Sequence, residues 1–212
     1  MVVNALAVAS TANKRVAPRQ VLLFSGHRVD APGREHPRFP ATMVPQAAAA
    51  IAHALDALDA RAGDLALAQG AAGGDLLFAE ACAARGVRVE LLLPRPEAEF
   101  IEQSVFGSDG EEDWPARYFD LRARLKDAPR VMPDELGPLP AHGNAFERCN
   151  LWLLSNVLAY GIDKVRFVCL WDGGGDGPGG TAHMYREMNR RTGRVTWIDT
   201  RCLGAQTGAS MN

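Results

Sequence analysis

The residues of this chain best suited to chemistry gather in glycine-rich segments, and the richest segment spans residues 171–183. Six of the eight residues at 173–180 are glycine. A backbone without Cβ atoms can approach a ligand closely, so its N–H groups can converge on an anion where the next helix begins. We interpret this run as a phosphate-binding loop, although composition alone favours a flexible loop. Its predicted ligand contacts are Trp171, Asp172, Gly177, Gly179, Gly180 and Thr181.

Two further polar loops follow short apolar runs that are typical of buried strands. Residues 25–30 carry histidine and arginine, which can hydrogen-bond a base or sugar and grip a phosphate. Residues 69–75 lack the GxGxxG pattern of dinucleotide-binding proteins and the Lys-Ser/Thr pair that ends a Walker loop. Standard dinucleotide-binding and NTPase functions are therefore disfavoured. Asp75 either caps the next helix or hydrogen-bonds a ribose hydroxyl. The predicted ligand contacts of these loops are Ser25, Gly26, His27, Arg28, Asp30, Gly70, Gly73, Gly74 and Asp75.

Another group of polar residues opens an otherwise apolar helix expected at 145–159. Asn144 and Arg148 are its predicted ligand contacts, and helix capping by Asn144 is an equal alternative. Because residues 151–158 are almost continuously apolar, we expect them to be core rather than an interface. Trp152 and Trp197 lie in apolar segments and are expected to be core as well.

Alternating strand-like and helix-like segments must position these loops. Strands are expected at 21–24, 65–68, 87–93, 130–132, 165–170 and 194–198, and helices at 44–60, 76–85, 98–105, 115–125, 145–159 and 183–191. This alternation predicts an α/β fold, a Rossmann-like three-layer sandwich with a mostly parallel sheet. Ligands bind at the carboxyl ends of such strands, where the polar loops would converge. We expect one domain at 19–202, a loose leader at 1–18 and a loose tail at 203–212.

Composition narrows the class of protein. The chain has 212 residues, a net charge of −2 and 23 scattered basic residues, which predicts no nucleic-acid partner. No segment reaches the roughly 18 apolar residues of a membrane helix, and Lys14 and Arg15 follow the apolar N-terminus instead of preceding it, so we expect neither membrane association nor export. Four well-separated cysteines without a CxxC pair favour a cytoplasmic protein with buried thiols.

The motifs resemble those of the SLOG superfamily, whose Rossmann-like members include the DprA and lonely-guy proteins. The resemblance covers about residues 21–198 and is carried by Ser25-Gly26, by residues 70–75 with Glu80, and by residues 177–181. It is closest to a subgroup found beside tetratricopeptide, CHAT or nucleotide-cyclase modules. The resemblance implies recognition of a nucleotide or nucleotide-derived signal in bacterial signalling, stress or defence, with a homo-oligomer or a signalling effector protein as partner.

Lonely-guy enzymes release the base from a nucleoside monophosphate and use a glutamate close behind the glycine motif. The resemblance therefore implies an enzymatic alternative, an N-glycosidic-bond hydrolase or transferase. In this chain His183 and Glu187 are the candidate catalytic residues, with Asp172 and Glu80 as further candidates. Glu187 is the first glutamate after the glycine motif and lies one turn further along the helix than the catalytic glutamate of the lonely-guy enzymes. This difference favours a binding module that needs no catalytic group and no cofactor.

A metal site is the least favoured of the chemical hypotheses. Magnesium could arrive with the ligand phosphates, but Asp172, Asp176 and His183 match no metal-ligand spacing, so we expect no metal site in the protein itself. A purely structural protein is also disfavoured, because three polar loops are expected at one edge of the sheet.

Overall fold

The structure is a computed structural model that describes residues 17–107, 113–175 and 180–203. Its centre is a six-stranded sheet in the order β4-β3-β2-β1-β5-β6, and every neighbouring pair is parallel. The expected α/β fold is therefore confirmed. The strands are β1 (Val21–Gly26), β2 (Leu65–Ala68), β3 (Arg88–Leu93), β4 (Arg130–Val131), β5 (Val165–Trp171) and β6 (Val195–Asp199).

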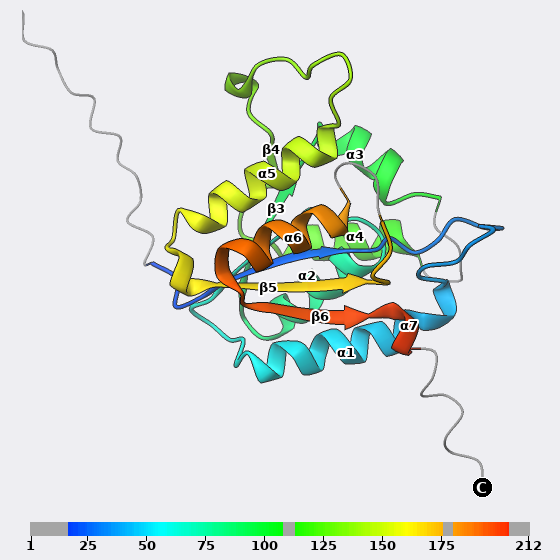
Figure 1. Cartoon of the computed structure of the whole chain (residues 1–212), viewed down its shortest axis with the longest axis horizontal. Helices are drawn as coiled ribbons and strands as arrows, with labels where there is room; N and C mark the ends of the chain where they lie inside the picture. The colour runs from blue at the N-terminus through cyan, green and yellow to red at the C-terminus, as the bar shows by residue number, and fades with distance from the viewer. Residues whose placement is uncertain (1–16, 108–112, 176–179, 204–212) are drawn as a thin grey trace, which may run out of the picture.

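Helices cover both faces of the sheet and complete a three-layer sandwich (Figure 1). The side chains of β1 alternate between the two layers, because successive residues of a strand point to opposite faces. Val21 and Leu23 join the core beneath α5 and α6, whereas Leu22 and Phe24 join the core with α1 and α2. The helices are α1 (Val44–Ala57), α2 (Gly74–Ala84), α3 (Glu97–Ser104), α4 (Trp114–Arg124), α5 (Ala145–Leu158), α6 (Thr181–Thr192) and α7 (Thr200–Leu203).

The elements lie close to their expected positions, with differences at their ends. β2 has the expected bounds, whereas α7 was not expected. Asp75 was expected as a possible cap of α2, but the capping position belongs to Gly73 and Asp75 lies in the first turn. α6 begins two residues earlier than expected, at Thr181. The predicted phosphate-loop threonine therefore opens the helix itself.

Two expectations about the core are wrong. Trp197 is 41% exposed, because β6 is an outer strand of the sheet and pairs on one side only. Leu151 is 44% exposed on α5, although Leu153 and Leu154 of the same helix are buried. One face of α5 packs on the sheet, and Leu151 lies with Ser155 on the exposed face. Trp152 is only partly buried and packs at the edge of the core.

The order of the strands makes the carboxyl ends of β1 and β5 a topological switch point. From β1 the chain continues to β2 on one side, and from β5 it continues to β6 on the other. The loops that leave two such neighbouring strands diverge, and ligands of open α/β sheets bind outside the carboxyl ends at this switch point. The sequence predicts polar loops after both of these strands. None of the described helices is long and apolar enough to cross a membrane.

Candidate functional site

A cavity of about 380 Å³ opens at the carboxyl ends of β1 and β2, beside the starts of α5 and α6. This volume is within the range of small-molecule binding sites. Its lining combines backbone from two glycine-containing loops with histidine, arginine and carboxamide side chains. The lining residues are Phe24, Ser25, Gly26, His27, Arg28, Arg38, Gln69, Ala71, Asp75, Ser104, Asn144, Phe146, Asn150, Gly180 and Thr181.

The first turn of α6 borders this cavity. Gly180 holds the N-cap position in an extended conformation, and no side chain of the described residues caps the helix. The Oγ atom of Ser25 lies 3.3 Å from Oγ1 of Thr181, which joins the end of β1 to the start of α6. The first N–H groups of a helix have no acceptor within the helix, and the helix dipole favours negative charge there. This end of the cavity is therefore suited to an anion.

Two arginines bring positive charge to the same cavity. Arg28 donates through Nη1 to the carbonyl oxygen of Gln103 at 2.8 Å, which anchors it to the end of α3. Because this acceptor is neutral, the bond orders the side chain without cancelling its charge. Burial lowers the pKa of Arg28, and the charge of Asp75 opposes that effect. Arg38 reaches the cavity from the loop that precedes α1.

Asp30 organises that loop. Its Oδ2 atom accepts hydrogen bonds from the backbone N–H groups of Arg38 and Phe39, each at 2.8 Å. Asp30 is buried and does not line the cavity. We therefore assign it the positioning of Arg38, whereas the sequence analysis predicted a direct contact with the ligand.

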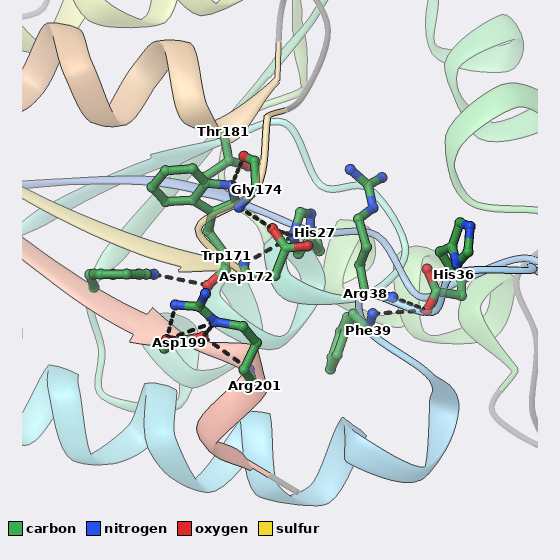
Figure 2. A network of polar contacts seen from close by, with 12 residues as sticks. His27, His36, Arg38, Phe39, Trp171, Asp172, Gly174, Thr181, Asp199 and Arg201 are labelled. Atoms are coloured by element: carbon green, nitrogen blue, oxygen red, sulfur yellow. Dashed lines mark hydrogen bonds and ion pairs between the residues drawn. The ribbon is translucent and has the colours of Figure 1, made fainter.

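His27 and Asp172 connect the loops on either side of the switch point (Figure 2). The backbone N–H of Asp172 donates to Nε2 of His27 at 3.2 Å, and Oδ1 of Asp172 lies 3.1 Å from the same nitrogen. Burial would raise the pKa of Asp172, but the backbone hydrogen bond from Gly174 and the adjacent His27 outweigh it and lower the pKa. His27 lines the cavity, whereas Asp172 contacts His27 but does not line the cavity.

Asp75 shapes the loop after β2. Its Oδ2 atom accepts hydrogen bonds from the N–H groups of Gly70 at 3.1 Å and Ala71 at 3.4 Å. Burial raises the pKa of Asp75 to about 6, against the opposing effect of these backbone hydrogen bonds. The side chain of Asp75 also lines the cavity. Asp75 therefore both holds the loop after β2 in place and is available to a ligand.

Three of the predicted ligand-binding glycines instead allow protein segments to approach one another. A Cβ atom on Gly73 would lie 2.6 Å from the backbone nitrogen of Val29, because Gly73 pairs with Arg28 across the two loops. A Cβ atom on Gly74 would meet the ring of Phe24 at 3.1 Å. Gly70 has a positive φ of 92° beside Leu91. These three glycines do not line the cavity, but Gly26 does.

Two further predicted contacts lie outside the cavity. Arg148 donates to the carbonyl oxygens of Gly137 and Pro138, at 2.7 and 3.1 Å, and borders a neighbouring hollow near β4. Trp171 packs its ring against Tyr185 and Trp197, with centroid distances of 5.2 and 5.5 Å. Asn144 caps α5 through hydrogen bonds to two backbone N–H groups and also lines the cavity, so both of its expected roles remain compatible.

The candidate catalytic residues are also away from the cavity. Glu187 accepts hydrogen bonds from Arg190 at 3.0 Å and Arg191 at 2.9 Å, and these contacts lower its pKa. His183 lies in the first turn of α6 but does not line the cavity. Gly177 and Gly179 fall outside the described residues, as does Asp176. The carboxylate of Glu80 accepts a hydrogen bond from Arg117 at 3.0 Å.

Seven residues that line the cavity are not among the predicted ligand contacts: Phe24, Arg38, Gln69, Ala71, Ser104, Phe146 and Asn150. Gln69 and Asn150 share a hydrogen bond of 2.9 Å, and both are polar residues beside strongly apolar segments, which was an available signal. Arg38, Ser104 and Phe146 come from a loop, a helix end and a helix start that only the tertiary structure brings together.

The described part of the chain contains no cluster of three or more His, Cys, Asp or Glu residues that could hold a metal ion. Cys82, Cys149 and Cys169 are buried thiols, as expected, whereas Cys202 of α7 is exposed, contrary to expectation. Burial raises the pKa of Cys169 to about 12, which keeps this thiol protonated and unreactive.

Comparisons with known proteins give no family for this chain. No family model matches it, and a search of curated proteins finds no match. Among solved structures, the Moco carrier protein from Chlamydomonas reinhardtii aligns with 89% of this chain and 95% of its own, at 12% identity and a TM-score of 0.34. Such a distant likeness carries no functional argument, so the function must be argued from the site.

Proposed function

We propose that this protein binds a phosphorylated nucleoside or a related nucleotide-derived ligand in the cavity at the β1–β5 switch point. The observation that carries the proposal is the position of the first turn of α6, which opens onto the same cavity as Arg28 and Arg38. A helix start and two guanidinium groups are complementary to a phosphate in charge and in hydrogen bonding.

The buried hydroxyl group of Ser104 favours a polar ligand in the cavity. Ser104 is 1% exposed and lines the cavity, and its Oγ atom has no hydrogen-bond partner among the described residues. A buried polar group without a partner costs free energy, so such groups are normally satisfied. A ligand oxygen in the cavity would supply the missing hydrogen bond.

Binding without turnover is the function that the described lining supports best. Asp75 is the only carboxylate among the lining residues described, and its Oδ2 atom already accepts backbone hydrogen bonds. Cleavage of a glycosidic bond requires a group that stabilises positive charge on the ribose. Neither Glu187 nor His183 is placed at the cavity to do so. We therefore favour a binding module that senses its ligand over a hydrolase or transferase.

The cellular role that we propose follows from the resemblance to SLOG proteins. A sensor of this kind would act in the cytoplasm of a bacterium during signalling, stress or defence. A second copy of the chain or an effector protein would respond to the bound ligand. Magnesium would enter only with the phosphates of the ligand, because the described residues provide no metal cluster.

The experiment compares two charge-removing variants of the full chain by calorimetry with ribose 5-phosphate and AMP. Arg28→Gln should raise the Kd of both compounds about tenfold or more, since it removes a charge-assisted bond to phosphate. Arg124→Gln is the matched control, because Arg124 is exposed on α4 and does not line the cavity. Equal Kd values in the two variants, or no binding of either compound by the parent protein, would overturn the proposal.

A further inference from the structure

We infer that the end of this cavity away from the phosphate site reads a heterocyclic base through the paired carboxamides of Gln69 and Asn150, an inference that rests on the proposed function. The base would carry a hydrogen-bond donor next to an acceptor, as adenine does. Nothing in the phosphate site itself requires such a base.

The carboxamide pair is built into the junction of β2 and α5. Gln69 follows the last residue of β2 and is half-buried, and Asn150 is 3% exposed on α5. Nε2 of Gln69 donates to Oδ1 of Asn150 at 2.9 Å, and both residues line the cavity. Burying polar side chains is costly unless they are hydrogen-bonded, and this bond fixes the orientation of Gln69.

The chemistry of the carboxamide group defines the ligand edge. The bond to Asn150 uses one of the two N–H donors of Gln69. The other N–H and the carboxamide oxygen form a neighbouring donor and acceptor. Glutamine recognises adenine in this way, through the amino group and the adjacent ring nitrogen. A carboxylate at this position would present acceptors only and would prefer a base with two neighbouring donors.

The phosphate and base ends of the site lie at the ends of neighbouring strands. Leu23 of β1 pairs with Leu67 of β2, so Ser25 and Gln69 come two residues later on neighbouring strands. Such strands lie about 4.8 Å apart. Ser25 contacts the start of α6, whereas Gln69 contacts α5, so the phosphate and base groups are set apart across the strand ends.

Phe146 adds an aromatic ring to the base end. It lies in the first turn of α5, is partly buried against the core and lines the cavity. Aromatic side chains stack on nucleic-acid bases with little dependence on which base is present. In this arrangement Phe146 supplies affinity and the carboxamide pair supplies the choice of base.

The test uses the full chain and measures the Kd of AMP, GMP and ribose 5-phosphate by calorimetry. The parent protein should bind AMP about fivefold or more tightly than ribose 5-phosphate, since one good bidentate contact is worth about 1–3 kcal/mol and 1.4 kcal/mol is a tenfold change in Kd. Gln69→Met should remove this preference without changing the Kd of ribose 5-phosphate. Gln69→Glu should shift the preference from AMP towards GMP, because its carboxylate accepts from both donors of guanine.

The control is Asn156→Leu, which removes a carboxamide from α5 at a position that does not line the cavity. It should leave all three Kd values unchanged. If the parent protein binds ribose 5-phosphate as tightly as AMP, the base inference is overturned and the proposed phosphate site stands. If both Gln69 variants weaken all three compounds equally, the pair is structural only and the inference is again overturned. If the parent protein binds none of the three, the proposed function fails and the inference fails with it.

Discussion

The Nε2 atom of His27 lies 3.1 Å from Oδ1 of Asp172, although 145 positions separate the two residues in sequence. His27 follows β1 and Asp172 follows β5, the two neighbouring strands at which the sheet changes direction. The contact ties the arginine-bearing loop after β1 to the loop that leads into the glycine-rich run. The contact between His27 and Asp172 therefore helps to hold the loop that lines the cavity in place.

Replacing His27 with leucine should destabilise the fold and weaken ligand binding. The backbone N–H of Asp172 would lose its acceptor, and because this bond is partly buried the expected cost is about 1 kcal/mol, the lower end of the range for buried groups. Urea unfolding measures the free energy of unfolding, and calorimetry with ribose 5-phosphate measures binding. His53→Leu is the control, because His53 is exposed on α1. Equal loss of stability in both variants would show that the contact to Asp172 contributes nothing specific.

Gly73 and Gly161 offer a matched test of the close approach between the first two loops. Both have a positive φ, 106° and 104°, but a Cβ atom meets backbone at 2.6 Å on Gly73 and meets no described atom within 4 Å on Gly161. Gly161→Ala should cost about 1–3 kcal/mol of stability from backbone strain alone. Gly73→Ala should cost about 1–3 kcal/mol more from overlap with Val29.

Urea unfolding of the two glycine variants provides the measurement. Gly73→Ala should also weaken the binding of ribose 5-phosphate, because Gly73 pairs with Arg28 and holds the loop that carries it. If the two variants lose the same stability, the loops can separate without cost and their pairing does not position Arg28.

The sequence was sufficient to predict the sheet edge at which the polar loops meet. Parallel strands place their carboxyl ends on one edge, so identifying the apolar runs that end at Ser25 and Gln69 was enough to bring those loops together. A helix start behind the glycine-rich run was expected for the same reason, although α6 begins at Thr181 and not at the expected residue 183. These predictions depend on local runs of apolar residues. Such runs are easy to recognise in this chain, because the strands of a parallel sheet covered on both faces are apolar on both sides.

Contacts made between distant segments could not be predicted in this way. The exposure of Trp197 depends on β6 being an outer strand, and local sequence does not contain the order of the strands. Ser104 reaches the cavity because the backbone N–H of Ala72 donates to its carbonyl oxygen at 2.9 Å. Gly73 and Gly74 lie in a segment whose composition is typical of a phosphate loop. In the structure they lie against the backbone of Val29 and the ring of Phe24.

Replacing Glu187 with glutamine distinguishes a binding module from an enzyme. Its carboxylate accepts hydrogen bonds from Arg190 and Arg191 on the same helix and does not line the cavity. We therefore expect Glu187→Gln and His183→Ala to leave the Kd of AMP unchanged. Mass spectrometry after prolonged incubation with AMP should detect no free adenine with the parent protein or with either variant. Adenine released by the parent protein but by neither variant would restore the hydrolase hypothesis.

Asp75 should make stability depend on pH in a direction opposite to that of most carboxylates. Burial raises its pKa from 3.8 to about 6, so between these values the folded chain holds a proton that the unfolded chain has released. The stabilisation is fully present below the unfolded pKa and is lost as the pH rises through about 6. At 1.36 kcal/mol per pKa unit, the loss is about 3 kcal/mol.

The variant Asp75→Asn isolates this effect. Asparagine keeps an oxygen that can accept from Gly70 and Ala71 but cannot ionise, so the variant should not lose stability through this titration. Urea unfolding of both proteins between about pH 4.5 and 7.5 should show the parent losing stability relative to the variant as the pH rises. The pKa values of Asp64 and Asp172 are lowered, so these two residues change the stability below this pH range and in the opposite direction. A stability difference that does not change with pH would show that the carboxylate of Asp75 is better solvated than its burial indicates.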